Sequence, residues 1–97
     1  MLGISLRRMR VDERVVFAEI EDEAVLLNVE SGIYFGLDPV GTRIWKLLVQ
    51  GASEDDIVGQ ILTEYDAESE QVGADVAAFL SLLETHGLAW TSSGSEG

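Results

Sequence analysis

The sequence predicts an α+β fold with a winged-helix-like outline, in which a three-stranded antiparallel sheet is followed by three helices. Two observations indicate this class. Apolar residues occur in short β-rich runs in the first part of the chain, and they change to helical spacing after Asp38-Pro39. A third observation sets the number of domains: 97 residues are enough for one hydrophobic core but marginal for two. We therefore expect a single compact domain.

Two strands joined by a tight turn are predicted at Ala24–Glu30 and Ile33–Leu37. The Ser-Gly pair between them supplies the small residues that a short hairpin loop needs. Arg14–Glu21 is rich in Val, Phe and Ile and is predicted to be the remaining strand. Both faces of Ala24–Glu30 are largely apolar. We therefore expect helices on one face and the N-terminal residues 1–13, as an arm or extra strand, on the other.

The first two helices are marked by their ends. Asp38 can cap free backbone donors and Pro39 suits the first helical position, so a helix is predicted to begin there. Gly51 is placed to end it. Ser53 and the three acids after it predict the start of the second helix, because acids are favourable at the positive end of a helix.

The third helix is predicted to begin near Glu68 or Ser69 and to continue to His86, where a glycine follows. The compact domain is expected to comprise residues 14–90. Residues 91–97 are rich in Ser and Gly and are predicted to form a flexible tail.

Composition excludes several classes of protein. There is no cysteine and one histidine, so disulfides, thiolate metal sites and histidine-rich metal sites are excluded. No serine or cysteine motif surrounds His86, and no phosphate-binding or dinucleotide fingerprint is present. We therefore expect no enzymatic activity and no cofactor. No apolar run approaches the length of a membrane span and no signal sequence is evident, so a cytoplasmic location is expected.

Charge is distributed unevenly along the chain. The net charge is −12, and from Leu47 onward there are ten acidic residues and no Lys or Arg. A winged-helix DNA-binding protein is the competing interpretation of the fold outline. Such a protein needs basic residues near bases and phosphates, and the helical half cannot supply them. The acidity has two interpretations that remain open, namely solubility and attraction of a basic partner.

The strand predicted at Ile33–Leu37 contains neither a charge nor a proline. Proteins usually protect a sheet edge with such residues, so an unprotected edge is a candidate site for an added peptide strand. An open edge could equally pair with the same edge of a second copy, which would make the chain a structural dimerisation module. Whether the protein is a monomer or a homodimer is left open.

An ordered set of residues between about 15 and 90 resembles the PqqD-like family. No single piece of the pattern is specific, but its order and spacing are. The residues that carry the resemblance are Val25, Leu26, Leu27, Asn28, Ser31, Gly32, Ile33, Tyr34, Phe35, Gly36, Leu37, Asp38, Val40, Gly41, Thr42, Ile44, Trp45, Gly51, Ser53, Ile57, Glu64, Tyr65, Asp75, Val76, Phe79, Leu80, Leu83, Gly87 and Leu88.

The resemblance implies a stand-alone recognition element for ribosomally made, post-translationally modified peptides. Such proteins bind the leader of a precursor peptide and present it to a maturation enzyme. That enzyme is a radical SAM enzyme in some pathways and a leader peptidase with a cyclase in lasso-peptide pathways. The family's leader adds to the third strand of the sheet and packs beside the third helix. By position, the implied peptide-binding residues are Ile33, Tyr34, Phe35, Gly36, Leu37, Val72, Asp75, Val76 and Phe79.

The strand residues in this set also have a plainer interpretation. Ile33, Phe35 and Leu37 lie on one face of the strand and are expected to belong to the core. Only Tyr34 and the main chain would then face a ligand.

The helix residues are open to the same question. Val76, Phe79 and Leu83 follow helical spacing, which favours a buried core position over a groove. Asp75 is either a solvent-facing residue or an acceptor for a Lys or Arg of the leader.

Overall fold

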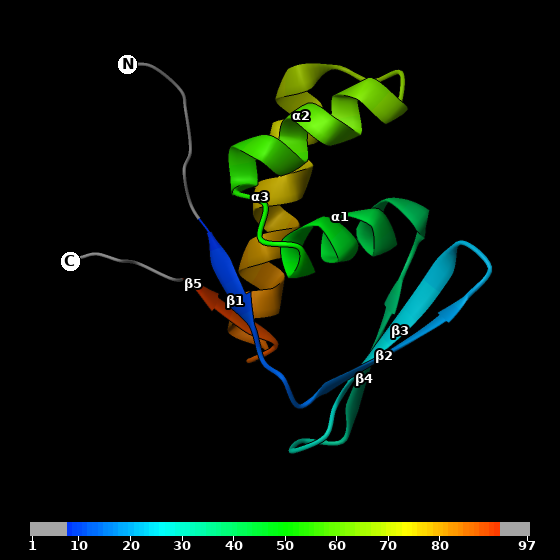
Figure 1. The fold of residues 1–97 in the computed structure, drawn as a ribbon, viewed down its shortest axis with the longest axis vertical. Coiled ribbons are helices and arrows are strands. Elements are labelled where there is room, and N and C mark those ends of the chain that lie inside the picture. Colours follow the sequence, from blue (N-terminus) through cyan, green and yellow to red (C-terminus); the bar gives the residue numbers. More distant parts are fainter. Residues whose placement is uncertain (1–7, 92–97) are drawn as a thin grey trace.

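The computed structural model describes residues 8–91. Figure 1 shows a small sheet, helices grouped on one side of it and, apart from this sheet, the short strands near the two ends of the described chain. The elements in chain order are β1 (Met9–Val11), β2 (Val15–Ile20), β3 (Glu23–Asn28), β4 (Ile33–Leu37), α1 (Pro39–Val49), α2 (Glu54–Glu64), α3 (Ser69–Thr85) and β5 (Ala89–Thr91). The predicted α+β class, with a three-stranded antiparallel sheet followed by three helices, is confirmed.

The sheet has the order β2-β3-β4, and both of its pairings are antiparallel. Leu26 at its centre is fully buried and pairs with Phe17 on β2 and Phe35 on β4. The predicted Ser-Gly turn is present, and Gly32 has a φ of 74°, a conformation that glycine adopts without strain. The turn thereby returns β4 along β3 in a fixed register.

The predicted helix starts are present at both Asp38 and Ser53. The Asp38 Oδ1 atom accepts a hydrogen bond of 2.7 Å from the Gly41 backbone N–H, with Pro39 in the first turn. Ser53 and Asp56 form a reciprocal capping box with two hydrogen bonds of 3.2 Å. These contacts satisfy backbone donors that the first turn of a helix leaves free.

The hydrophobic core lies between the helices and the face of the sheet that carries Ala24 and Leu26. Helix α1 contacts both β3 and β4, and Trp45 is buried in this layer. The buried apolar residues are Met9, Ala24, Leu26, Leu37, Ile44, Trp45, Leu47, Leu48, Ile57, Ile61, Val72, Val76, Leu80, Leu83, Leu88 and Ala89. Burial of these side chains is the main force that holds α1, α2 and α3 on the sheet.

The N-terminal residues do not have the position expected for them. β1 pairs with β5, with Met9 opposite Thr91, and does not cover the second face of the β2-β3-β4 sheet (Figure 1). The expectation of an arm on that face is therefore wrong for residues 8–13. Buried Met9 and Ala89 explain the pairing, because β1 and β5 together close the core beside α1 and α3. Residues 1–7 of the expected arm and residues 92–97 of the expected tail lie outside the described residues.

Candidate functional site

The candidate site is the edge of the sheet formed by β4. β4 pairs with β3 on one side, and within residues 8–91 no strand pairs with its other side. The strand carries no charged side chain. Its outer row of backbone donors and acceptors is therefore available to another extended segment.

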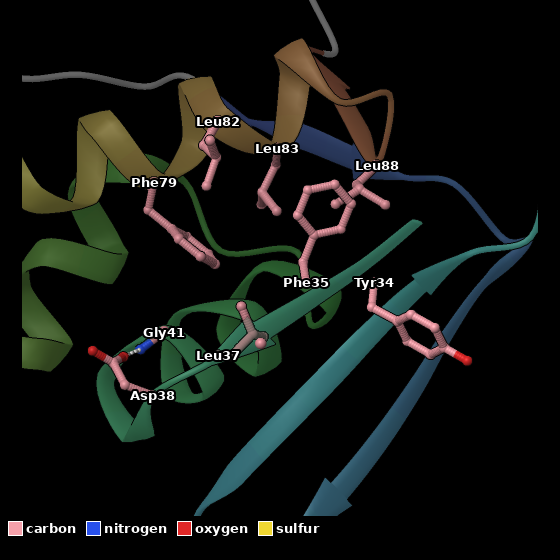
Figure 2. A pocket seen from close by; sticks show the side chains of 10 residues that line it. Tyr34, Phe35, Leu37, Asp38, Gly41, Phe79, Leu82, Leu83 and Leu88 are labelled. Atoms are coloured by element: carbon pink, nitrogen blue, oxygen red, sulfur yellow. Dashed lines mark hydrogen bonds between the residues drawn. The ribbon is translucent and has the colours of Figure 1, made fainter. Parts of the chain in front are cut away.

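A groove lies beside this open edge, between β4 and α3, with a volume of about 480 Å³. Figure 2 shows Phe79, Leu82 and Leu83 on the helix side, facing Phe35 and Leu37 on the strand side. The complete lining is Tyr34, Phe35, Gly36, Leu37, Asp38, Gly41, Phe79, Leu82, Leu83 and Leu88. Most of these side chains are apolar, so the groove suits apolar side chains of an extended peptide.

Side chains of β4 alternate between the two faces of the sheet. Phe35 and Leu37 point to the groove side, whereas Tyr34 points away from it (Figure 2). Leu37 is buried and Phe35 is half-buried against the core, as expected. The core position expected for Ile33 is wrong, because this residue next to the turn is 50% exposed. The Phe35 ring lies 4.7 Å from the His86 ring, centroid to centroid, at the end of α3. His86 thus helps to fix the ring that forms one wall of the groove.

Helix α3 brings only one of its four predicted residues to the groove. Phe79 lines it. Val72 and Val76 are 6% and 1% exposed and belong to the core, so they contact α2 and its surroundings instead. Asp75 is exposed and accepts a hydrogen bond of 2.9 Å from the Gln71 side chain. That these four residues bind a peptide stays a prediction, and the structure gives Val72 and Val76 a supporting position.

The sequence did not single out several residues of the lining, namely Asp38, Gly41, Leu82 and Leu88. Leu83 also lines the groove, and its expected core position is confirmed by an exposed fraction of 1%. Leu82 carried a usable signal, because it is apolar, lies off the buried stripe of α3 and follows Phe79 by three residues. It is 47% exposed and lies in the lining with Phe79, so it adds to an apolar surface instead of standing alone.

The end of the groove beside α1 is kept open by Gly41. A Cβ atom at this position would lie 3.2 Å from Asp38 Oδ1 and 3.6 Å from Phe79 Cε1. Glycine therefore allows the capping carboxylate and the phenylalanine ring to approach the same point of the helix.

Charge around the groove favours cations. Asp38 is the one charged residue in its lining, within the described part of the chain. The basic side chains of Arg14, Arg43 and Lys46 are paired elsewhere, with Asp12 and Glu30, with Glu64 and with Glu19 respectively. Hydrogen bonds from Arg43 hold the pKa of Glu64 below its ordinary value. Among residues 8–91, α1 is the one helix that carries Lys or Arg, and both of its basic side chains, Arg43 and Lys46, are paired with acids.

Residues 8–91 contain neither a metal-binding cluster nor a membrane-spanning helix. No group of three or more His, Asp or Glu side chains could hold a metal ion there. No helix in the same range is long and apolar enough to cross a bilayer.

The fold and the groove place the chain in a class of small α+β domains with an open sheet edge, the arrangement through which proteins receive an extended peptide as an added strand. The chain belongs to the PqqD family. The model of the family described as "Coenzyme PQQ synthesis protein D (PqqD)" matches residues 23–89, a range that contains all of β3, β4, α1, α2 and α3.

Two solved structures are similar to this chain. One, described as "TbiB1 in Complex with the TbiA(beta) Leader Peptide", is 39% identical, covers 90% of this chain and 99% of its own, and has a TM-score of 0.78. The other, "Lasso peptide synthetase B1 complexed with the leader peptide", is 28% identical, covers 84% and 96%, and has a TM-score of 0.77. No curated protein matches the chain in sequence.

Proposed function

We propose that the protein is a non-catalytic adaptor that binds the leader of a ribosomally made precursor peptide and presents the peptide to a maturation enzyme. The observation that carries the proposal is the apolar groove beside the open, uncharged edge of β4. The two similar structures support it, because both are complexes with leader peptides.

In this proposal the leader pairs with Ile33–Leu37 as an additional strand. Backbone hydrogen bonds supply affinity that depends little on the leader's side chains, and the groove supplies specificity. Alternate leader side chains enter the groove against Phe35, Phe79 and Leu82, because successive side chains of a strand point to opposite faces. Asp75, one helical turn before Phe79, accepts a Lys or Arg of the leader beyond the groove.

The kind of maturation enzyme that works with the protein is inferred from the same two structures. Likeness to a lasso peptide synthetase component favours a leader peptidase with a cyclase over a radical SAM enzyme. We place the protein in the cytoplasm, where precursor peptides are made, and assign it no cofactor.

A pair of proline variants tests strand addition. Adjacent residues of a strand direct their N–H groups to opposite edges, so one of Phe35 and Gly36 donates to β3 and the other to the open edge. We expect Phe35→Pro and Gly36→Pro to differ: one destabilises the sheet, and the other keeps the fold but weakens leader binding about tenfold or more by removing one ladder donor. The measurements are thermal melting and fluorescence anisotropy with a labelled TbiA(beta) leader peptide, the ligand in one of the two similar structures.

The control for this pair is Ala18→Pro on β2, which lies on the opposite edge strand of the sheet. If the β4 variant that keeps the fold binds the leader as the unmodified protein does, strand addition at β4 is wrong.

A further inference from the structure

The face of the β2-β3-β4 sheet opposite the groove, called the outer face here, is apolar and uncovered within residues 8–91. Val16, Ile20 and Tyr34 on this face are 49%, 70% and 70% exposed. The register aligns its residues in rows across the strands. The outer face consists of Val16, Ala18, Ile20, Val25, Leu27, Tyr34 and Gly36. A continuous exposed apolar patch of this kind marks an interaction surface more often than single exposed residues do.

The outer face also contains a hollow. A depression of about 350 Å³ lies where β2 and β4 end and β3 begins. Its lining includes the apolar Ile20 and Val25, Gly36 and the acids Glu23 and Asp38. Gly36 helps to open it, since a Cβ atom there would meet nothing within 4 Å. The surface therefore has a raised row, Val16-Leu27-Tyr34, next to a space that an apolar side chain of a partner can enter.

The charges around the outer face indicate which kind of partner it can bind. β2, β3 and β4 contain no Lys or Arg, and three consecutive acids, Glu21, Asp22 and Glu23, border the hollow end of the face. Two copies of a chain with net charge −12 would bring these acids together, so self-association through this face is disfavoured. A partner with an apolar surface bordered by Lys and Arg is complementary.

The outer face is continuous with the site proposed above. It reaches the edge of β4, so an added leader strand would extend it by one strand. Leader side chains that do not enter the groove would then project from the same surface as Tyr34. A protein that covers the outer face would touch both the adaptor and the bound leader.

We propose that the outer face is the docking surface for the enzyme that acts on the bound peptide, an enzyme with an apolar patch bordered by basic residues. The proposal rests on the proposed function, because the leader forms part of the docking surface. It explains how an enzyme distinguishes loaded from empty adaptor: the loaded sheet offers one more strand of contact. Binding of leader and enzyme is therefore mutually reinforcing.

The test uses Val16→Lys and Ile20→Lys on β2, which lie outside the groove, and Val49→Lys on α1 as a matched control. Val49 is 59% exposed, between Val16 at 49% and Ile20 at 70%, and lies on an element that packs on the other face of the sheet. The partner probe is a purified leader peptidase, the kind of enzyme that the proposed function pairs with this chain. Calorimetry measures its association with each adaptor variant, with and without leader, and mass spectrometry measures cleavage of the precursor.

We expect both β2 variants to bind leader within twofold of the unmodified protein but to lose at least tenfold in peptidase association and cleavage. Val49→Lys should change neither quantity. Peptidase association with the unmodified protein should tighten when leader is present and weaken as salt rises. Unchanged peptidase association in the β2 variants overturns the docking surface. Failure of the unmodified protein to bind leader overturns the proposed function instead.

A photo-crosslinking amino acid at position 20 identifies the occupant directly. The expected product contains the peptidase and forms in higher yield with leader present. A product that joins two copies of the chain, or joins position 20 to residues 1–7 of the same chain, overturns the proposal.

Discussion

Phe79 is the residue of α3 on which the groove depends most, because it faces β4 while its neighbours Val76 and Leu80 are buried in the core. We expect Phe79→Ala to lower leader affinity about tenfold, since a truncated aromatic anchor in an interface costs more than roughly 1 kcal/mol. Fluorescence anisotropy with labelled leader measures the change. Tyr65→Ala, at the end of α2, is the control for loss of a partly exposed aromatic ring and should leave affinity unchanged.

Gly41 on α1 and Gly59 on α2 allow a matched comparison of the effect of an added Cβ atom on stability. A Cβ atom at Gly59 would meet nothing within 4 Å, whereas one at Gly41 would lie 3.2 Å from Asp38 Oδ1. Gly59→Ala should raise the free energy of unfolding by about 0.5–1 kcal/mol, because alanine loses less conformational entropy in a helix. Gly41→Ala should gain less, and should weaken leader binding by narrowing the groove. Denaturant unfolding and leader anisotropy give the two quantities, and equal gains for both variants would contradict the close approach at Gly41.

At the scale of elements, the capping box of α2 makes stability depend on pH. Hydrogen bonds from Ser53, the backbone one first, hold the pKa of Asp56 below its ordinary value. A carboxylate whose pKa is lower in the folded state stabilises the fold above its unfolded pKa of about 3.9 and loses that effect as pH falls.

Asp56→Ala should therefore destabilise the protein at pH 7, and the difference from the unmodified protein should shrink as pH is lowered through 4 toward 3. Urea unfolding at a series of pH values measures it. Asp66→Ala, in the segment between α2 and α3, serves as the comparison outside the capping box. A difference that stays constant down to pH 3 would show that the Asp56 charge is not what stabilises the helix.

Local chemistry explains which elements the sequence could predict. β4, the start of α1 and the Ser53 cap depend on neighbouring residues, so their signals lie within a few positions, and all three are present as predicted. The β1–β5 pair joins three-residue strands from opposite ends of the chain. Strands that short have no readable period, and nothing local specifies their partner.

Only the strand side of the candidate site could be predicted from the sequence. Its strand side follows from the alternation of β4, which places Phe35 and Leu37 together. Its helix side depends on the rotation of α3 against the core, which places Leu82 in the lining and Val76 in the core. A periodic apolar stripe does not contain this information, because it shows which residues are apolar and not which neighbour each one meets.

For the molecule as a whole, the uneven distribution of charge is the dominant feature. Leader binding should weaken as salt rises when the leader carries Lys or Arg, because salt screens attraction to the net charge of −12. Anisotropy titrations between low and high salt measure the effect. A leader with these basic residues replaced by Gln is the control and should show a smaller dependence, and an equal dependence for both peptides would exclude long-range attraction.

The pairing of β1 with β5 has a consequence for protein architecture. Met9 and Thr91 are direct neighbours across two strands, so the described chain starts and finishes at one point on its surface (Figure 1). A domain with adjoining ends can be inserted into a loop of a host protein without straining either of them. Residues 9–91 thus have termini close enough for the domain to be inserted into a loop of an enzyme, as well as to act as a separate chain.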